Sequence, residues 1–288
     1  MNILLIRSKA GIRYASHIRD YILSQGMDCH VTDILSVEDF IREKGLNPSN
    51  TLIYSRTAGP ETNKKIAEIE RAGFTVINSV RTLELTSNKY LAQIHAEECG
   101  IPIAKTYKVK KADLKKIREL AFMHQSVVLK PIFSQGQGIF CQKVTAGIAE
   151  ESLKTILDLM PGDEIQVQQF IDYEMLIRVI VINFKAIREA TTYDFPGQKD
   201  WKCSVCLNSK IKKYRDFADD LFVLAEKTAR DFNAKINFID FFKDMKGNFI
   251  LNEINTSCSL FLHEAVSGVR INELIGDFLI AQTSKLVQ

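Results

Sequence analysis

Short apolar runs alternate with amphipathic stretches over the first part of the chain. Buried strands of parallel sheets are continuous apolar runs, whereas surface helices carry apolar residues every three or four positions. Strands are expected at residues 2–7, 29–34, 51–55 and 74–78, and helices are expected to end near residue 25 and to span 37–44 and 60–72. This alternation predicts an α/β unit with a parallel sheet. No GxGxxG motif follows the first strand, so dinucleotide binding is not supported.

The remainder of the chain mixes helices with closely spaced strands. Helices are expected at 83–99, 113–124, 151–160, 216–232 and 272–286, and strands at 103–109, 127–131, 139–144, 164–171, 175–183 and 186–192. The last two runs alternate or run apolar, as antiparallel strands do. The expected fold class is therefore α/β (α+β), with both kinds of sheet.

Two further apolar runs near the C-terminal end of the sequence flank a turn-type cluster with a glycine. This pattern predicts a β-hairpin. If residues 245–248 form the loop, Asp244 pairs with Phe249, and counting outward brings Asp240 opposite Glu253. The two runs are residues 237–242 and 249–255.

The predicted hairpin gathers oxygen atoms on one face. Asn255 follows Glu253 by two positions and shares its face, so an amide oxygen joins the two carboxylates. Opposed carboxylates among apolar side chains need a neutralising partner. Hard oxygens suit Mg²⁺, so Asp240, Glu253 and Asn255 are predicted metal ligands. The alternative is a polar face exposed to water, because one residue more or less in the loop shifts the pairing. The expected apolar neighbours are Phe238, Phe242, Phe249 and Leu251.

Two basic residues stand inside or at the end of apolar runs. Lys130 ends the run at 127–131 and precedes a loop with two glycines, whose backbone N–H groups could bind phosphate. An ordinary β-turn is the alternative for this loop. A lysine buried at a strand end needs an anionic partner. Arg178 also needs an anion, either a ligand or an ion-pair partner such as Glu174 or Glu189.

The composition is that of a globular protein and narrows the partners. The chain has 288 residues, of which 46% are hydrophobic and 25% charged, and a net charge of +3. This length suits about two domains, and the mild positive charge suits an anionic small molecule without requiring nucleic acid. No apolar run reaches the roughly 18 residues of a membrane span, and no signal-peptide pattern opens the sequence, so we expect a cytoplasmic protein.

The cysteines and histidines suggest no metal site of their own. Six cysteines are spread along the chain and are expected to be reduced. The lone pair Cys203 and Cys206 lacks the additional ligands that a zinc site requires. The five histidines show no spacing pattern and are expected to be surface or structural residues.

This order of parts resembles the ATP-grasp superfamily over nearly the whole chain, most closely its RimK-like glutamate ligases. Segments that carry the resemblance are Asn78-Ser79, Ser87-Asn88-Lys89, Gly100 to Ile103, Val128 to Pro131 and Ile177-Arg178-Val179. The resemblance implies that phosphate is bound by Lys89, Lys130 and the loop residues Ser134, Gln135, Gly136 and Gly138, and that adenine is bound at Gln168, Gln169, Phe170 and Ile171. It also implies metal binding at Asp240, Glu253 and Asn255, and catalytic roles for Arg178 and Lys202.

The same resemblance implies a domain organisation and an activity. The expected parts are an N-terminal Rossmann-like domain at 1–87, a central ATP-grasp subdomain with the phosphate loop at 88–172, and a C-terminal subdomain with the metal site at 173–288. The implied activity is an ATP-dependent carboxylate–amine ligase that works through an acyl phosphate. Its cofactors would be ATP and two Mg²⁺ ions, with Mn²⁺ as a substitute, and its partners a carboxylate and an amino acid or other amine. Glutamate is the first candidate for the amino acid, joined to a small molecule or a peptide.

Several positions depart from the family pattern and put the substrate in doubt more than the fold. Gln169 and Leu176 stand where Glu and Asp are usual, Lys202-Cys203-Ser204 replaces an Arg-x-Asn element, and Thr256-Ser257-Cys258 replaces a Pro-Gly. An ATP-grasp kinase and a non-catalytic nucleotide-binding module stay open as alternatives. A homo-oligomer also stays open, no membrane or nucleic-acid partner is expected, and no residue stands out as a general base.

Overall fold

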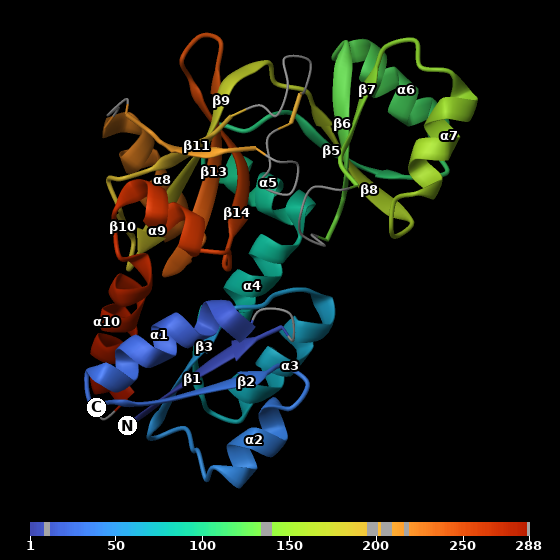
Figure 1. Cartoon of the computed structure of the whole chain (residues 1–288). Coiled ribbons are helices and arrows are strands. Elements are labelled where there is room, and N and C mark those ends of the chain that lie inside the picture. Colours follow the sequence, from blue (N-terminus) through green and yellow to red (C-terminus); the bar gives the residue numbers. More distant parts are fainter. Residues whose placement is uncertain (9–11, 134–139, 195–200, 203–208, 216–218, 287–288) are drawn as a thin grey trace.

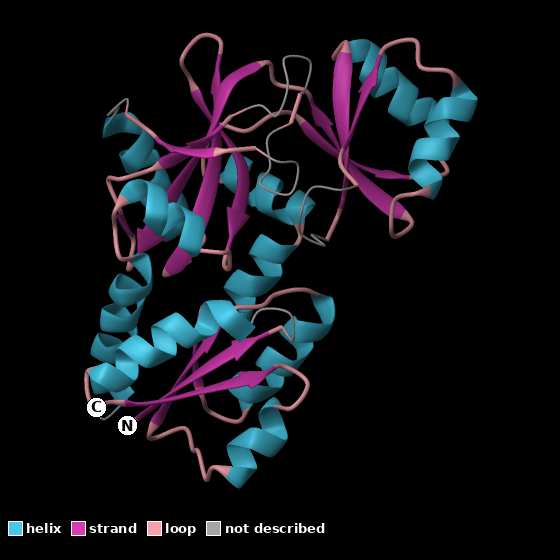
Figure 2. Ribbon diagram, viewed as in Figure 1, coloured by secondary structure: helices cyan, strands magenta, loops and turns pink. Residues whose placement is uncertain are grey.

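Three β-sheets with helices packed against them make up the described part of the chain (Figures 1 and 2). The computed structural model describes residues 1–8, 12–133, 140–194, 201–202, 209–215 and 219–286. One sheet is parallel and the other two are antiparallel. The structure therefore confirms the mixed α/β class. The domain limits at 87 and 172 stay a prediction.

The first sheet is formed by the alternating segment at the start of the chain. Its strands are β1 (Asn2–Arg7), β2 (Asp28–Asp33), β3 (Thr51–Ser55) and β4 (Thr75–Ile77), which lie parallel in the order β2-β1-β3-β4. The connecting helices are α1 (Ile12–Ser24), α2 (Val37–Glu43) and α3 (Pro60–Arg71). All seven elements lie where the hydrophobic pattern predicts them. Pro60 is at the first position of α3, where a missing backbone N–H costs nothing.

The single helix expected at 83–99 is wrong, because the chain forms two helices there. They are α4 (Val80–Ser87) and α5 (Lys89–Glu98). Asn88 between them has an extended backbone, and its side-chain oxygen accepts a hydrogen bond from Leu91 N at 3.0 Å. An amide that caps a new helix competes with continuation of the old one. Lys89 is consequently the first residue of α5.

The second sheet is antiparallel and has its own core. Its strands are β5 (Thr106–Lys110), β6 (Ser126–Pro131), β7 (Gln142–Thr145) and β8 (Glu164–Gln169) in the order β5-β8-β6-β7, with helices α6 (Leu114–Met123) and α7 (Glu150–Asp158) beside them. Figure 1 shows this part as a separate lobe with α6 and α7 on one side of the sheet. In the described part of the chain, all residues of its core cluster lie between Tyr107 and Val167.

The third sheet has six strands and carries the predicted hairpin. The strands are β9 (Tyr173–Ile182), β10 (Lys185–Ala186), β11 (Thr191–Tyr193), β12 (Ile211–Lys213), β13 (Ile236–Asp244) and β14 (Phe249–Asn255), in the order β12-β11-β9-β13-β14 with β10 beside β9. The helices are α8 (Asp219–Asp231), α9 (Phe261–Ser267) and α10 (Ile271–Thr283), followed by a 3₁₀ turn (Ser284–Leu286). The hydrophobic pattern missed α9, which has only seven residues and ends at Gly268 in the left-handed conformation.

The first and third sheets share one apolar core. Leu5 and Tyr54 of the first sheet belong to the same buried cluster as Phe238 of β13 and Ile275 of α10. In Figure 1, α10 lies beside α1. Asn78 adds a polar link, since its amide exchanges hydrogen bonds of 2.7 Å with Ile236 O and Lys235 N. Among the described residues, no helix has both the length and the apolar character needed to cross a bilayer.

Candidate active site

The β13–β14 hairpin places Asp240 directly opposite Glu253, as the sequence predicts. The route to this pairing differs from the prediction, because Phe249 pairs with Lys243 rather than with Asp244. The loop is therefore one residue longer than predicted, and a register shift between Asp240 and Phe241 compensates for it.

The same irregularity separates neighbours that strict alternation would place together. Leu251 and Phe249 pack with Ile239 and Phe241, on the sheet face opposite to Asp240, so their expected place beside the carboxylates is wrong. Asn255 pairs with Phe238 and stays on the face of Glu253. A bulge residue changes the face that the following side chains occupy.

Arg178 neutralises Asp240. The two residues lie opposite each other on β9 and β13, and Arg178 Nε and Nη2 donate to the two Asp240 oxygens at 2.7 and 2.6 Å. Burial raises the pKa of Asp240, and the guanidinium opposes this shift. Asp240 is only 4% exposed, which excludes a water-facing position. The anion that Arg178 needs is therefore Asp240, and not Glu174 or Glu189.

Lys89 neutralises Glu253. The Lys89 ammonium at the start of α5 donates a hydrogen bond to Glu253 Oε1. Burial alone would raise the pKa of Glu253, but Lys89 reverses the shift and holds that pKa below its usual value. Lys89 N also donates to Ile132 O at 2.8 Å, so the start of α5 is fixed to the end of β6.

Among the described residues, Lys130 near the end of β6 donates to neutral oxygens. Its ammonium donates to Gln168 Oε1 at 2.7 Å and to Asn252 Oδ1 at 3.1 Å. Burial lowers the pKa of Lys130, and the nearby Lys89 lowers it further. Gln93 Nε2 donates to Asn252 O at 3.0 Å, and Gln168 Nε2 donates to Gln93 Oε1 at 3.2 Å. These amides join β8, α5 and β14 around Lys130. Because amide oxygens carry no net charge, the positive charge of Lys130 could be neutralised by a bound anion.

Lys202 lies near the end of β8, where adenine contacts are expected. Its ammonium donates to Cys141 O at 3.2 Å. The adjacent Trp201 ring packs edge-on against Phe170, with centroids 6.3 Å apart. Lys143 Nζ lies 3.4 Å from the centroid of the Phe170 ring. Phe170, Gln169 and Ile171 are all half-buried.

Part of the predicted site lies outside the described residues. This applies to the loop residues Ser134, Gln135, Gly136 and Gly138 and to the Cys203–Cys206 pair. The strands on either side of the loop, β6 and β7, pair antiparallel.

The structure adds three site residues that the sequence analysis missed. Asn252 and Gln93 contact the lysine network, and Cys141 is close enough to Lys89 and Lys130 for a thiolate there to raise the pKa of both lysines. Gln93 is buried on α5, one turn after Lys89, which is a signal that the helical spacing contained. Asn252 faces Lys130 at the register shift, which no pattern in the sequence reveals.

The donor set at the hairpin fits Mg²⁺. Asp240 and Glu253 are directly opposed, and the amide of Asn255 shares their face. Mg²⁺ is usually held by one or two carboxylates together with substrate phosphates. Within the described ranges, no cluster of three or more His, Cys, Asp or Glu side chains could hold a metal ion. An ion bound at the hairpin would therefore need the amide and substrate oxygens to complete its shell.

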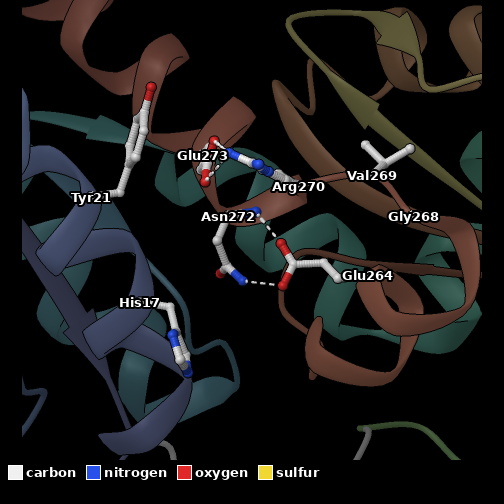
Figure 3. A pocket seen from close by; sticks show the side chains of 8 residues that line it. All are labelled: His17, Tyr21, Glu264, Gly268, Val269, Arg270, Asn272 and Glu273. Atoms are coloured by element: carbon white, nitrogen blue, oxygen red, sulfur yellow. Dashed lines mark hydrogen bonds and ion pairs between the residues drawn. The ribbon is translucent and has the colours of Figure 1, made fainter.

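A separate polar pocket lies between α1 and the segment that joins α9 to α10 (Figure 3). Its volume is about 490 Å³. Glu264 forms one wall and accepts hydrogen bonds from Asn272 N at 2.7 Å and Asn272 Nδ2 at 2.8 Å, which caps the start of α10. None of the predicted site residues lines this pocket. The lining residues are His17, Tyr21, Glu264, Gly268, Val269, Arg270, Asn272 and Glu273.

Sequence comparisons give no relative for this chain. No protein-family model matches it, and no curated protein sequence matches it.

Solved structures do match the whole chain. D-alanyl-alanine synthetase A from Vibrio cholerae superposes with a TM-score of 0.74 at 16% identity, over 100% of this chain and 99% of that chain. The ATP-grasp ligase PsnB, complexed with a phosphomimetic variant of its minimal precursor, Mg and ADP, gives a TM-score of 0.73 at 16% identity, over 98% of both chains. A RimK domain ATP-grasp protein from Sphaerobacter thermophilus gives 0.71 at 15% identity, over 96% of this chain and 99% of that chain. From its first strand to its last helix, this chain therefore has the ATP-grasp fold.

Proposed function

We propose that this chain is an ATP- and Mg²⁺-dependent carboxylate–amine ligase that works through an acyl phosphate. The observation that carries the proposal is the convergence of three cationic side chains on an opposed pair of carboxylates. Lys89 and Arg178 each contact one carboxylate, and Lys130 lies beside Lys89. Phosphoryl transfer needs this combination, with lysines for phosphate oxygens and carboxylates for a divalent cation.

The chemistry explains why ATP is required. A carboxylate does not acylate an amine at neutral pH, because oxide is too poor a leaving group. Attack of the carboxylate oxygen on the γ-phosphorus of ATP breaks the bond to the bridging oxygen and gives an acyl phosphate and ADP. The amine then attacks the acyl carbon, phosphate leaves, and the amine loses a proton. The sum is carboxylate plus amine plus ATP to amide, ADP and phosphate.

The side chains of this site suit both steps. Lys89 and Lys130 would bind phosphate oxygens, with Lys89 exchanging Glu253 for the nucleotide. Arg178 and Lys202 would stabilise negative charge on the transferred group and on the tetrahedral intermediate. Asp240, Glu253 and Asn255 would hold Mg²⁺, two ions in our proposal, which neutralise the phosphates and align the attack. The half-buried segment from Gln169 to Ile171, with Gln168 before it, would receive the adenine.

The substrates are proposed at the level of chemical class. PsnB, which has the same fold, is complexed with a precursor peptide, and this supports a peptide as one substrate. D-alanyl-alanine synthetase A supports an amino acid as the other. Glutamate remains the first amino acid to try. Dependence on ATP favours a cytoplasmic location.

The first test is calorimetric titration of the folded protein with ATP, with and without Mg²⁺. We expect Mg²⁺-dependent binding by the wild type that weakens about 10- to 100-fold in Glu253→Gln. Glu84→Gln, on the exposed side of α4, is the matched control and should bind like the wild type. No nucleotide binding by folded wild-type protein would refute the proposal. Mass analysis of the product then separates the alternatives, since a ligase gives an amide adduct and a kinase gives a phosphate adduct.

A further inference from the structure

Two arginines end neighbouring strands of the parallel sheet. Arg7 is the last residue of β1, and Arg56 directly follows β3. Ile6 pairs with Ser55, and Arg56 N donates to Ile6 O at 2.7 Å, so the two arginines are adjacent in register. The strand order β2-β1-β3-β4 reverses between β1 and β3. Open α/β sheets bind ligands at the carboxyl ends of the strands where the order reverses.

Both arginine side chains are assigned to the same face of the sheet. Leu5 and Tyr54 belong to the core cluster beneath α1 and α10. Side chains alternate along a strand, so Arg7 follows Leu5 and Arg56 follows Tyr54 onto this face. The contact of Arg56 Nη2 with Cys258 O at 2.9 Å agrees with that direction.

Two N–H groups of the Arg7 guanidinium are buried without an acceptor among the described residues. The side chain is 9% exposed, and Nε and Nη1 are buried without a hydrogen-bond partner in the described part of the chain. Asp33 on β2 is the nearby carboxylate, but one of its oxygens accepts hydrogen bonds from Leu35 N and Ser36 N, and the other from Ser36 Oγ. The neighbouring Arg19 is paired with Asp20. A buried N–H group without an acceptor is costly, and on a charged group it is more so.

The same face holds a further donor and leads to the catalytic centre. Tyr54 is fully buried, and its hydroxyl has no hydrogen-bond partner among the described residues. Arg56, which donates to Cys258 O, is the charged group that most affects this hydroxyl. The Cys258 thiol in turn contacts Arg178, which binds Asp240. Arg56, which is adjacent to Arg7 in register, is thus connected through Cys258 and Arg178 to Asp240 in the proposed site of acyl-phosphate formation.

We propose that Arg7, Arg56 and Tyr54 bind a carboxylate of the substrate that is not itself activated. The substrate would then carry two carboxylates, one held by these donors and one that receives the phosphoryl group near Asp240 and Glu253. Guanidinium groups match the planar carboxylate with paired hydrogen bonds. In the proposed site, Lys89 and Lys130 bind the phosphates of ATP, so these arginines are not needed for that role. The inference rests on the proposed ligase function only for the fate of the second carboxylate.

Calorimetry with glutarate, and with pentanoate as the compound with one carboxylate, tests the site without turnover. We expect glutarate to bind wild-type protein at least 10-fold more tightly than pentanoate, in the presence of Mg²⁺ and a non-hydrolysable ATP analogue. Arg7→Gln should weaken glutarate binding about 10- to 100-fold, and Tyr54→Phe, which removes only a hydroxyl, about 2- to 10-fold. Binding of the ATP analogue should not change in either variant. Arg71→Gln, at the exposed end of α3, is the matched control.

Stability gives a second and independent measurement. Replacing an arginine of a structural ion pair would lower the melting temperature, whereas replacing an arginine whose partner is a bound ligand should not lower that of the free protein. We expect Arg7→Met to melt at or above the wild-type temperature without ligand and to lose the stabilisation that glutarate gives the wild type. A lower melting temperature for Arg7→Met, with unchanged glutarate binding, would overturn the inference.

The outcomes separate this inference from the proposed function. Equal binding of glutarate and pentanoate by a protein that binds Mg²⁺ and ATP overturns the carboxylate site alone. Arg7-dependent glutarate binding by a protein that does not bind ATP overturns the ligase and keeps the site. Displacement of glutarate by an equal concentration of inorganic phosphate would assign a phosphate site and overturn the inference. An N-acetylated Glu-Glu peptide amide that binds more tightly than glutarate would identify a peptide, rather than a free diacid, as the source of the carboxylates.

Discussion

Replacing Arg178 by Met tests how the two carboxylates of the hairpin are held. The Arg178 and Asp240 side chains are 15% and 5% exposed and share two hydrogen bonds. Without the guanidinium, Asp240 is buried opposite Glu253, whose own partner Lys89 is already engaged. Removing one member of a buried ion pair costs about 3–5 kcal/mol. At about 2–4 °C per kcal/mol for a chain of this size, the melting temperature should fall by roughly 6–20 °C.

The assay is urea unfolding followed by circular dichroism, together with thermal melting, in EDTA at pH 7.5. The double variant Arg178→Met/Asp240→Asn should recover about 2–3 kcal/mol relative to Arg178→Met, because the uncompensated charge is gone. Mg²⁺ should raise the melting temperature of Arg178→Met more than that of the wild type, since it supplies the missing positive charge. Arg188→Met is the matched control. Its ion pair with Asp219 is exposed and should contribute less than about 1 kcal/mol.

A melting temperature for Arg178→Met within 2 °C or so of the wild type would refute this reasoning. It would mean that water reaches Asp240 or that another group takes over its neutralisation. Equal stabilisation of both proteins by Mg²⁺ would argue against Asp240 and Glu253 as the metal ligands.

Three further predictions concern single side chains. Burial lowers the pKa of His263 to about 3, so the folded state resists protonation that the unfolded chain accepts below pH about 6.5. The free energy of unfolding, measured with urea, should therefore fall by about 2 kcal/mol between pH 6.5 and 5, and His263→Asn should remove this pH dependence. Glu264→Ala removes the cap of α10 and should lower the free energy of unfolding by about 1–2 kcal/mol. Glu264→Gln keeps an acceptor for Asn272 N and should lower it less, so equal losses of stability would contradict a capping role. Alkylation of Cys141 by iodoacetamide, followed by mass spectrometry, should slow at saturating ATP and Mg²⁺ because Cys141 O accepts a hydrogen bond from Lys202 of the proposed site. An unchanged rate would place the nucleotide elsewhere.

Much of the fold follows from hydrophobic periodicity alone. The parallel sheet and its three helices lie within a residue or two of their predicted bounds, because its two central strands, β1 and β3, are largely apolar and buried runs. The pairing of Asp240 with Glu253 could also be predicted. This prediction is correct because a bulge in the hairpin offsets an error of one residue in the predicted loop length. No pattern in the sequence indicates that bulge.

The contacts within the site could not be predicted, because they join elements far apart in the chain. Arg178 and Lys130 were identified as charges that require partners. Their partners, Asp240 for one and Asn252 with Gln168 for the other, depend on the order of strands in two sheets. The break at Asn88 was missed because a cap in the middle of an amphipathic pattern leaves the periodicity almost unchanged.

The distribution of apolar cores has a consequence for hydrogen exchange. Among the described residues, the sheet β5-β8-β6-β7 and its two helices bury a cluster whose side chains lie between Tyr107 and Val167, whereas the other two sheets share a cluster that includes Phe238 and Ile275. Contacts from this lobe to the third sheet include the polar ones around Lys130 and Asn252, so separating them exposes little of either core. Amides of β5, β6, β7, β8, α6 and α7 should therefore exchange with deuterium as one cooperative unit, and those of the parallel and six-stranded sheets together as another.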